Sequence, residues 1–126
     1  MKSWCKEFSE RHKMTVDFRS DVPVPLPFEI GLSLFRVLQE ALHNAAKHSG
    51  AKRFEVQLEE DSNQVHLQVK DLGSGFDLEA AQRGSGLGLT SMQERLKLVG
   101  GQLSIESKPQ QGTTIHAHVP FYPEVK

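Results

Sequence analysis

Hydrophobic and polar residues follow one another along the chain in patterns that predict two helices. From Phe28 to His48 apolar residues recur at helical spacing with no proline among them, which predicts one long amphipathic helix. Met92, Leu96 and Val99 share a second helical stripe, and the glycine pair that follows it is a typical helix end. We therefore expect a shorter helix over residues 89–99.

Strict alternation of apolar and polar residues predicts strands elsewhere in the chain. Three prolines in residues 21–27 forbid a helix there and favour an extended connector before the long helix. Polar turns at 61–63 and 109–112 separate the later strands into hairpins. The predicted strands are one single strand and two hairpins: 14–18, 54–58 with 65–69, and 103–105 with 115–119.

The order of these elements predicts the fold class. Adjacent hairpins dominate the sequence β, α, β, β, α, β, β, so the sheet should be mixed but mostly antiparallel. Its helices should pack on one face, which makes an α+β two-layer sandwich. The 126 residues suffice for one core, and we expect residues 1–126 to form a single domain.

Composition excludes some classes of partner and says little else. A net charge of −1 gives no basic excess for a nucleic acid or a membrane surface. Cys5 is the only cysteine, so it cannot form an internal disulfide, which suits a reducing compartment. No apolar run approaches the roughly 20 residues that span a bilayer. We expect a cytoplasmic domain that makes no direct membrane contact, whatever a longer parent protein does.

One face of the long helix carries candidate chemistry. Glu40, Asn44 and His48 lie four residues apart and so line one stripe, with Lys47 beside its end. On spacing alone a solvated polar face is the more common explanation of such a stripe. Asparagine is nevertheless a poor helix former in mid-helix, which favours a further role for Asn44.

Strand parity turns two polar residues toward the interior. Asp71 shares the parity of Val65, Leu67 and Val69, and Thr113 shares that of Ile115. Asp71 either caps the following turn or accepts a hydrogen bond from a ligand amine. Thr113 by itself is ordinary for the start of a strand.

A glycine-rich stretch, residues 73–88, leads into the second predicted helix. Gly84, Gly86 and Gly88 precede Leu89, where unblocked amides and the helix dipole favour phosphate oxygens. Such a run is often only a flexible loop. Because no strand directly precedes it, the dinucleotide-binding fingerprint of a Rossmann fold is excluded.

Taken together and in order, these segments resemble the Bergerat-fold ATPase superfamily, which includes gyrase, heat-shock chaperone ATPases, mismatch-repair proteins and histidine kinases. The resemblance runs from about residue 28 to 120. Residues 40–48 resemble the asparagine box, 71–76 the first glycine box and 84–89 the second. Within the superfamily, residues 39–41, 47–48 and 92–96 resemble the sensor kinases that pair with NarL-type regulators.

The resemblance implies ATP and Mg²⁺ as cofactors. It implies that Asn44 ligates Mg²⁺, that Asp71 accepts a hydrogen bond from the adenine amine, and that Thr113 helps to hold adenine. Lys47 and His48 would lie toward the phosphates, and Glu40 would polarise or orient a nucleophile near the γ-phosphate. The residues that would bracket a lid over 76–83 or follow it are Gly73, Gly75, Gly84, Gly86, Gly88 and Leu89. Phe76 and Leu78 would anchor this lid.

The implied reaction needs a partner. The resembled kinases place the phospho-accepting histidine in a dimerising helical pair before this domain, and nothing before residue 14 has that motif. We therefore expect the acceptor on a helical domain of the same parent, a NarL-type response regulator downstream, and a monomeric isolated domain. Two alternatives are a non-catalytic nucleotide-sensing module and an anti-sigma-type serine kinase of the same fold.

Overall fold

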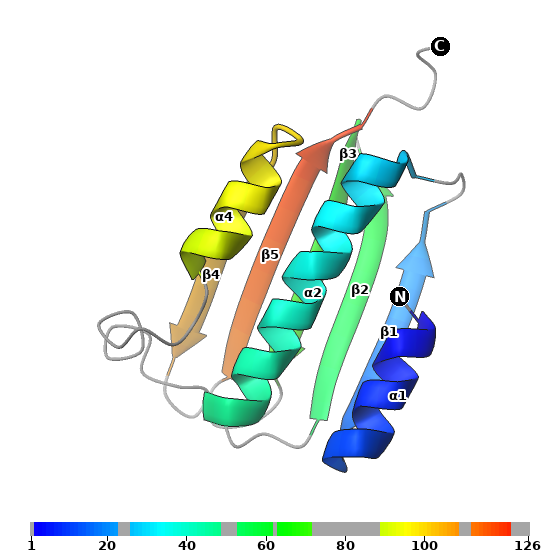
Figure 1. The fold of residues 1–126 in the computed structure, drawn as a ribbon, viewed down its shortest axis with the longest axis vertical. Coiled ribbons are helices and arrows are strands. Elements are labelled where there is room, and N and C mark those ends of the chain that lie inside the picture. The colour runs from blue at the N-terminus through cyan, green and yellow to red at the C-terminus, as the bar shows by residue number, and fades with distance from the viewer. Residues whose placement is uncertain are drawn as a thin grey trace.

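A computed structural model of the chain describes residues 2–22, 26–48, 53–61, 63–71, 89–108 and 112–121. Side chains 45–48, 89 and 107–108 are not described. Figure 1 shows the elements in the described part. In chain order they are α1 (Lys2–His12), β1 (Thr15–Asp21), α2 (Phe28–His48), β2 (Arg53–Asp61), β3 (Gln64–Asp71), α4 (Leu89–Lys97), β4 (Gln102–Lys108) and β5 (Gly112–Pro120).

The described strands form one five-stranded sheet in the order β1-β2-β3-β5-β4. β1 pairs with β2 in parallel, and the pairs β2-β3, β3-β5 and β4-β5 are antiparallel. α2 connects the parallel pair. The mixed, mostly antiparallel sheet predicted from the sequence is thus confirmed.

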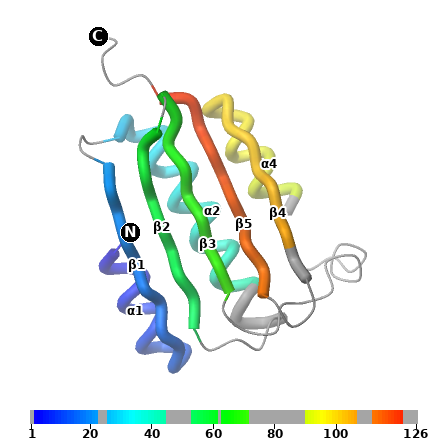
Figure 2. Tube along the Cα trace, turned by 180° about the vertical axis from the view of Figure 1, so that it is seen from behind, coloured from blue at the N-terminus to red at the C-terminus, as the bar shows by residue number. Residues whose placement is uncertain are grey.

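The core lies between the sheet and the described helices α1, α2 and α4, which lie on one face of the sheet (Figures 1 and 2). α2 contributes Leu34, Val37, Leu38 and Leu42, each with 0% of its surface exposed. Along most of β2, β3 and β5 every second residue is buried, as the alternation predicts, whereas the edge strand β1 has no fully buried residue. The two-layer α+β sandwich is confirmed.

The sequence interpretation missed the first helix, α1. Its buried residues are Cys5 and Phe8, and Trp4 stacks on Phe8 with ring centroids 5.2 Å apart. This apolar stripe is only two turns long, and Lys, Glu and Arg fill the rest of the helix, so the pattern is weak. Contact with Phe35 and His43 of α2 seats the helix against the rest of the fold.

Burial also decides the chemistry of the lone thiol. Cys5 is 1% exposed, and desolvation raises its pKa to about 11, against a smaller lowering effect of the positive N-terminus. A thiol with such a pKa stays protonated near neutral pH and behaves as a small apolar side chain.

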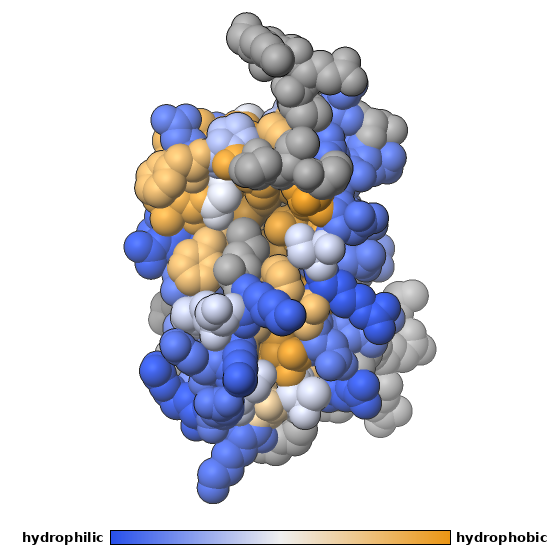
Figure 3. Space-filling model, turned by 90° about the vertical axis from the view of Figure 1, so that its right-hand side faces the viewer, coloured by the Kyte–Doolittle hydropathy of each residue, from blue (hydrophilic) through white to orange (hydrophobic). Residues whose placement is uncertain are grey.

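Apolar side chains also reach the surface on the side of the molecule where the edge strand β1 lies. Figure 3 shows them gathered in a vertical strip with hydrophilic residues on both flanks. Val16 and Phe18 of β1 are partly buried hydrophobics packed against the core. The side chains at this edge of the core are therefore only partly buried.

Three histidines cluster on strands β3 and β5. His66 Nδ1 lies 2.8 Å from His116 Nε2, and the ring of His118 lies within 6.0 Å of His66 and 5.5 Å of His116. Desolvation by burial is the largest cause that lowers the pKa of His116. Positive charge on His66 and His118 lowers this pKa further, and the negative charge of Glu59 opposes the shift. Within the described ranges, no three His, Cys, Asp or Glu side chains are arranged to hold a metal ion.

This cluster predicts a pH dependence of stability. His116 has a folded-state pKa below its ordinary value of 6.5, so the unfolded chain binds more protons as the pH falls through this region. Stability should therefore be highest above pH 6.5 and decrease below it. Melting temperatures at pH 7.5 and 5.5 should differ less in His116→Gln than in the parent.

The matched control is His12→Gln on α1, an exposed position outside the cluster. An equal pH response in His116→Gln and the parent would contradict the assignment.

Candidate functional site

Three polar side chains are buried in the described part of the chain, and all three were predicted as site residues. Asn44 is 6% exposed, Asp71 3% and Thr113 3%. Burying such groups costs free energy that surface positions avoid. A fold that places them together at one end of its core has the polar lining that ligand pockets require.

The topology brings these three residues to the same end of the sheet. Asp71 ends β3, and Thr113 is the second residue of β5. Because Lys70 pairs with Thr114, Asp71 and Thr113 are the next neighbours across the antiparallel ladder. α2 packs on both strands, and its carboxyl-terminal part, which carries Asn44, covers this end (Figure 1).

Strand parity explains why these side chains point inward. Val65, Leu67 and Val69 are buried, so the next residue of the same parity, Asp71, is carried into the same layer. Its Oδ2 atom is shielded from solvent. The parity argument made from the sequence is therefore confirmed for Asp71, and likewise for Thr113 below Ile115.

Glu40 lies one helical turn before Asn44 and borders a cavity of about 300 Å³ between α2 and α4. From α2 the cavity is lined by Arg36, Gln39, Glu40 and His43. From α4 it is lined by Ser91, Met92 and Arg95. Side chains of both charges thus line a cavity that begins one helical turn from Asn44.

α4 begins at Leu89, and its amino end lies at the same end of the molecule as the carboxyl end of α2 (Figure 1). The first amides of a helix have no partner within the helix and carry partial positive charge. They therefore suit an anion placed near the buried trio. The phosphate role predicted for the glycines before Leu89 stays a prediction, because those residues lie outside the described part of the chain.

Several predicted site residues lie outside the described part of the chain. These are Gly73, Gly75, Gly84, Gly86 and Gly88, together with the lid over 76–83. Lys47 and His48 belong to α2, but their side chains are not described, and neither is the side chain of Leu89. Their predicted roles stay predictions.

The sequence interpretation missed the cavity residues that surround Glu40. The i, i+4, i+7 spacing of one helix face is followed by Arg36, Glu40 and His43. The polar stripe predicted from Glu40 onward could therefore have been extended back to Arg36. Arg95 was noted only as part of a motif. The packing of α4 beside α2 could not be predicted from the sequence of either helix alone.

The sequence profile of the histidine kinase-, DNA gyrase B- and HSP90-like ATPases matches residues 29–123. The chain belongs to this ATPase family. It is 38% identical over 125 residues to the signal transduction histidine-protein kinase/phosphatase DegS of Brevibacillus brevis. The match covers 98% of this chain and 32% of that relative, so the chain spans about a third of its length.

Solved structures show the same fold. The blue-light activated histidine kinase EL346 of Erythrobacter litoralis superposes with a TM-score of 0.76 at 17% identity, over 95% of this chain and 40% of that one. The nucleotide-free catalytic domain of histidine kinase ThkA gives 0.69 at 19% identity, over 97% and 88%. Full-length ShkA in complex with AMPPNP gives 0.72 at 22% identity, over 99% and 30%.

No helix in the described part of the chain is long and apolar enough to cross a membrane.

Proposed function

We propose that the chain is the ATP-binding catalytic domain of a two-component sensor histidine kinase. It binds Mg-ATP, and the γ-phosphate passes to a histidine on a separate helical domain of the same parent protein. The observation that carries the proposal is the meeting of Asn44, Asp71 and Thr113, three buried polar side chains from three elements, at one end of an ATPase-family fold. The 38% identity with DegS favours a sensor kinase over an anti-sigma kinase.

Each residue has a role that its place in the fold supports. Asp71 accepts a hydrogen bond from the adenine amine, and Thr113, its neighbour across the ladder, helps to hold the ring. Lys47 and His48 lie toward the phosphates in this proposal. The amides near Leu89, and those of the glycines before it, receive phosphate oxygens.

The donor set fits Mg²⁺. This ion keeps several waters and takes only one or two protein oxygens besides those of the phosphates, so the amide oxygen of Asn44 suffices. When bound, it would neutralise phosphate charge. Asn44 holds its place because its helix is anchored by Leu38, Ala41 and Leu42 in the core.

The chemical step is in-line phosphoryl transfer. An imidazole nitrogen of the acceptor attacks the γ-phosphorus, the bond from that phosphorus to the bridging oxygen breaks, and ADP leaves. Glu40, exposed to the cavity beside Asn44, orients the imidazole and takes its proton. Most of the acceleration comes from positioning and charge neutralisation, which need no covalent intermediate on this chain.

The parent protein supplies what this domain lacks. The 32% share of DegS covered by the match leaves ample length in such a relative for a helical acceptor domain. We place this domain in the cytoplasm, with a NarL-type response regulator as the downstream partner. The isolated domain is then a monomer that labels no histidine of its own.

Calorimetric titration of the isolated chain tests nucleotide binding. ATP should bind in the presence of Mg²⁺, and GTP should bind much more weakly, because it offers an oxygen where adenine offers the amine that Asp71 accepts. Equal affinities for ATP and GTP would contradict the adenine assignment. No binding of either nucleotide would overturn the proposed function.

Asn44→Ala should reduce the Mg²⁺ dependence of ATP binding. The substitution removes the one protein oxygen assigned to the ion, and one charge-assisted contact is worth roughly tenfold in affinity. ATP affinity with and without Mg²⁺ should converge in the variant. Gln102→Ala on β4, an exposed amide far from the site, is the matched control. Full Mg²⁺ stimulation in Asn44→Ala would show that the ion is held elsewhere.

A further inference from the structure

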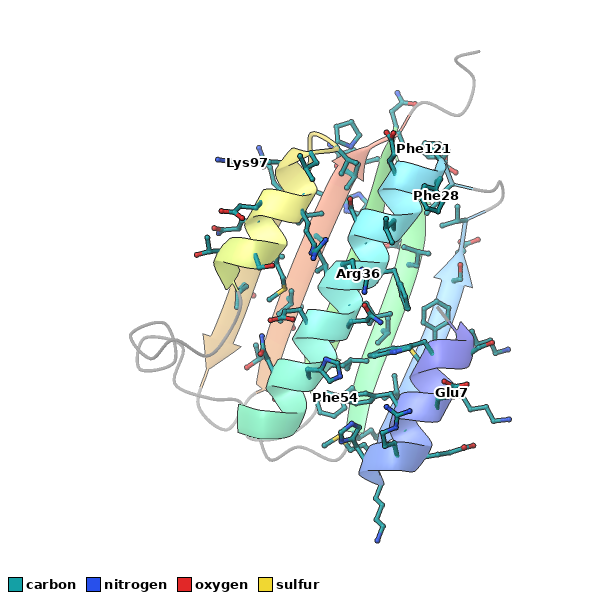
Figure 4. All side chains as sticks on the ribbon, viewed as in Figure 1. Glu7, Phe28, Arg36, Phe54, Lys97 and Phe121 are labelled. Atoms are coloured by element: carbon teal, nitrogen blue, oxygen red, sulfur yellow. The ribbon has the colours of Figure 1, made fainter. Side chains whose placement is uncertain are left out.

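The face of the sheet that points away from the helices carries the cluster of three histidines. Phe54 of β2 lies in the layer between the sheet and the helices (Figure 4), and the buried residues of β3 and β5 belong to the same core. His66, His116 and His118 have the opposite parity on their strands, so they lie on the open face, which is toward the viewer in Figure 2. All three are half-buried, and the proposed nucleotide site uses none of them.

The register of β3 and β5 brings the three rings together. His66 pairs directly with His118, and His116 lies two residues away on β5, on the same face. Two histidines at i and i+2 on one strand and a third on its neighbour can reach one region above the sheet. Glu59 of β2 pairs with His66 from the other side, and Gln102 of β4 pairs with His118. Side chains with oxygen donors therefore flank the histidine cluster on both sides.

The distances between the rings are close to those of imidazoles that share a metal ion. His66 Nδ1 and His116 Nε2 share a hydrogen bond of 2.8 Å. In a tetrahedral zinc site, Zn–N bonds of about 2.0–2.1 Å place two ring nitrogens about 3.3 Å apart and two ring centroids about 5.2 Å apart. The centroids of His66 and His116 are 5.0 Å apart here, those of His116 and His118 5.5 Å, and those of His66 and His118 6.0 Å.

Binding an ion needs a small rearrangement of side chains. As the rings stand, no three donor groups of the described residues surround a common point. The facing nitrogens of His66 and His116 must move apart by about 0.5 Å to reach the zinc spacing. The ring of His118 must turn about χ2, which is a broad torsion in histidine. These rotations leave the strands in register, and the half-buried positions leave room for them.

The donor atoms select the kind of ion. Imidazole nitrogens suit Zn²⁺, Cu²⁺ and Ni²⁺, whereas Mg²⁺ takes oxygen ligands. Three histidines leave a fourth position for a water molecule or for the carboxylate of Glu59. The histidine cluster is also remote from the nucleotide site, because His66 and Asp71 are five residues apart on β3, or about 17 Å. It therefore differs from the Mg²⁺ site proposed at Asn44 in both ion and place.

We propose that His66, His116 and His118 form a binding site for a divalent transition-metal ion of the zinc type. The ion takes the place of the hydrogen between His66 and His116, which moves to the other nitrogen of the same ring, and His118 supplies the third nitrogen. An ion held in this way links β3 to β5, the strands that carry Asp71 and Thr113. The proposal is independent of the proposed function, because none of the three histidines takes part in nucleotide binding or phosphoryl transfer.

Titration of the untagged chain with Zn²⁺ tests the site, after a chelator has removed any metal. At about pH 7.5, where free imidazoles are mostly neutral, calorimetry should show one Zn²⁺ bound per chain, and excess Mg²⁺ should not displace it. Zn²⁺ at a hundred times its dissociation constant should raise the melting temperature by about 5 °C or more. In NMR spectra the imidazole signals of His66, His116 and His118 should shift, and those of His12 should not.

Substitutions identify the ligands. His116→Gln should lower Zn²⁺ affinity about tenfold or more, because the loss of a group that only supports a metal ligand already costs that much. His118→Gln should lower the affinity by a similar factor, since it removes the third nitrogen. His12→Gln is the matched control, because it removes an exposed histidine on α1 and should leave Zn²⁺ affinity at the parent level. Circular dichroism checks that each variant is folded.

Each of four outcomes would contradict the metal site. A parent chain that binds no Zn²⁺ would leave His66 and His116 as a hydrogen-bonded pair only. Equal affinities in the parent and His116→Gln would place the ion elsewhere on the chain. A large loss of affinity in His12→Gln would instead point to His12 and His43, whose ring centroids are 6.4 Å apart. Unchanged affinity in His118→Gln would refute its role as the third ligand.

Discussion

Asp71→Asn is expected to abolish most of the stabilisation that ATP gives to this domain. ATP at a hundred times its dissociation constant should stabilise the parent fold by about 2.7 kcal/mol, which at roughly 3–6 °C per kcal/mol raises the melting temperature by about 8–16 °C. Asparagine keeps the shape of the side chain but replaces the charged acceptor, which costs about 1.5–3 kcal/mol of binding. Affinity for ATP should therefore drop roughly tenfold to hundredfold, and the thermal shift at the same ATP concentration should fall to between about a half and a sixth of the parent's.

The control for this prediction is Asp21→Asn, which makes the same chemical change at the exposed end of β1. It should retain the full ATP shift. Circular dichroism without ligand shows whether Asp71→Asn still folds, which matters because the side chain is only 3% exposed. A folded Asp71→Asn protein that keeps the parent's ATP shift would disprove the adenine assignment.

Parity is the reason that much of the site could be predicted from sequence. Side chains alternate between the faces of a strand, so the buried Val69 fixes where Asp71 points, and Ile115 does the same for Thr113. Helical periodicity placed Asn44 on one stripe of α2 with Glu40 and His48, and the poor helix propensity of asparagine favoured a further role for it. In each case a local rule links neighbours along the chain, and no knowledge of distant contacts is needed.

Features that depend on contacts between distant elements could not be predicted in this way. The stripe of α1 is short, and its helix is recognised only by the aromatic contacts that Trp4 and Phe8 make. The cavity between α2 and α4 is one such feature, because Arg36 and Arg95, which line it, lie on helices separated by two strands in the sequence. The parallel pairing of β1 with β2 likewise depends on contacts between segments that are distant in the sequence.

The two faces of the sheet carry polar residues in different places. The face under the helices is apolar except at the end where Asp71 and Thr113 lie. The strands also carry His66 and His116, which contact each other away from that buried layer. A ligand site at the end of the core costs the fold less than one at its centre, because only the last residues of each strand leave the apolar pattern.

Gly101→Ala is expected to destabilise the domain strongly, because the turn after α4 leaves no room for a Cβ. Gly101 donates its amide to the Leu96 carbonyl at 2.7 Å, and Gly100 has a positive φ of 74°, a combination that closes the helix end. A Cβ on Gly101 would lie 2.7 Å from the His118 carbonyl oxygen and 2.8 Å from Cγ2 of Val119. Relieving this overlap should cost about 1–3 kcal/mol, as overpacking usually does.

The strain would spread to both elements that the turn joins. Gln102, the first residue of β4, pairs with His118 on β5, so moving Gly101 away from His118 pulls at this ladder and at the end of α4 together. Gly31→Ala is the opposite case, because nothing lies within 4 Å of a Cβ built there and the residue is inside α2. That change should stabilise the domain by up to about 1 kcal/mol. Urea unfolding of the three proteins measures both effects, and a Gly101→Ala domain as stable as the parent would show that the turn has more room than its contacts indicate.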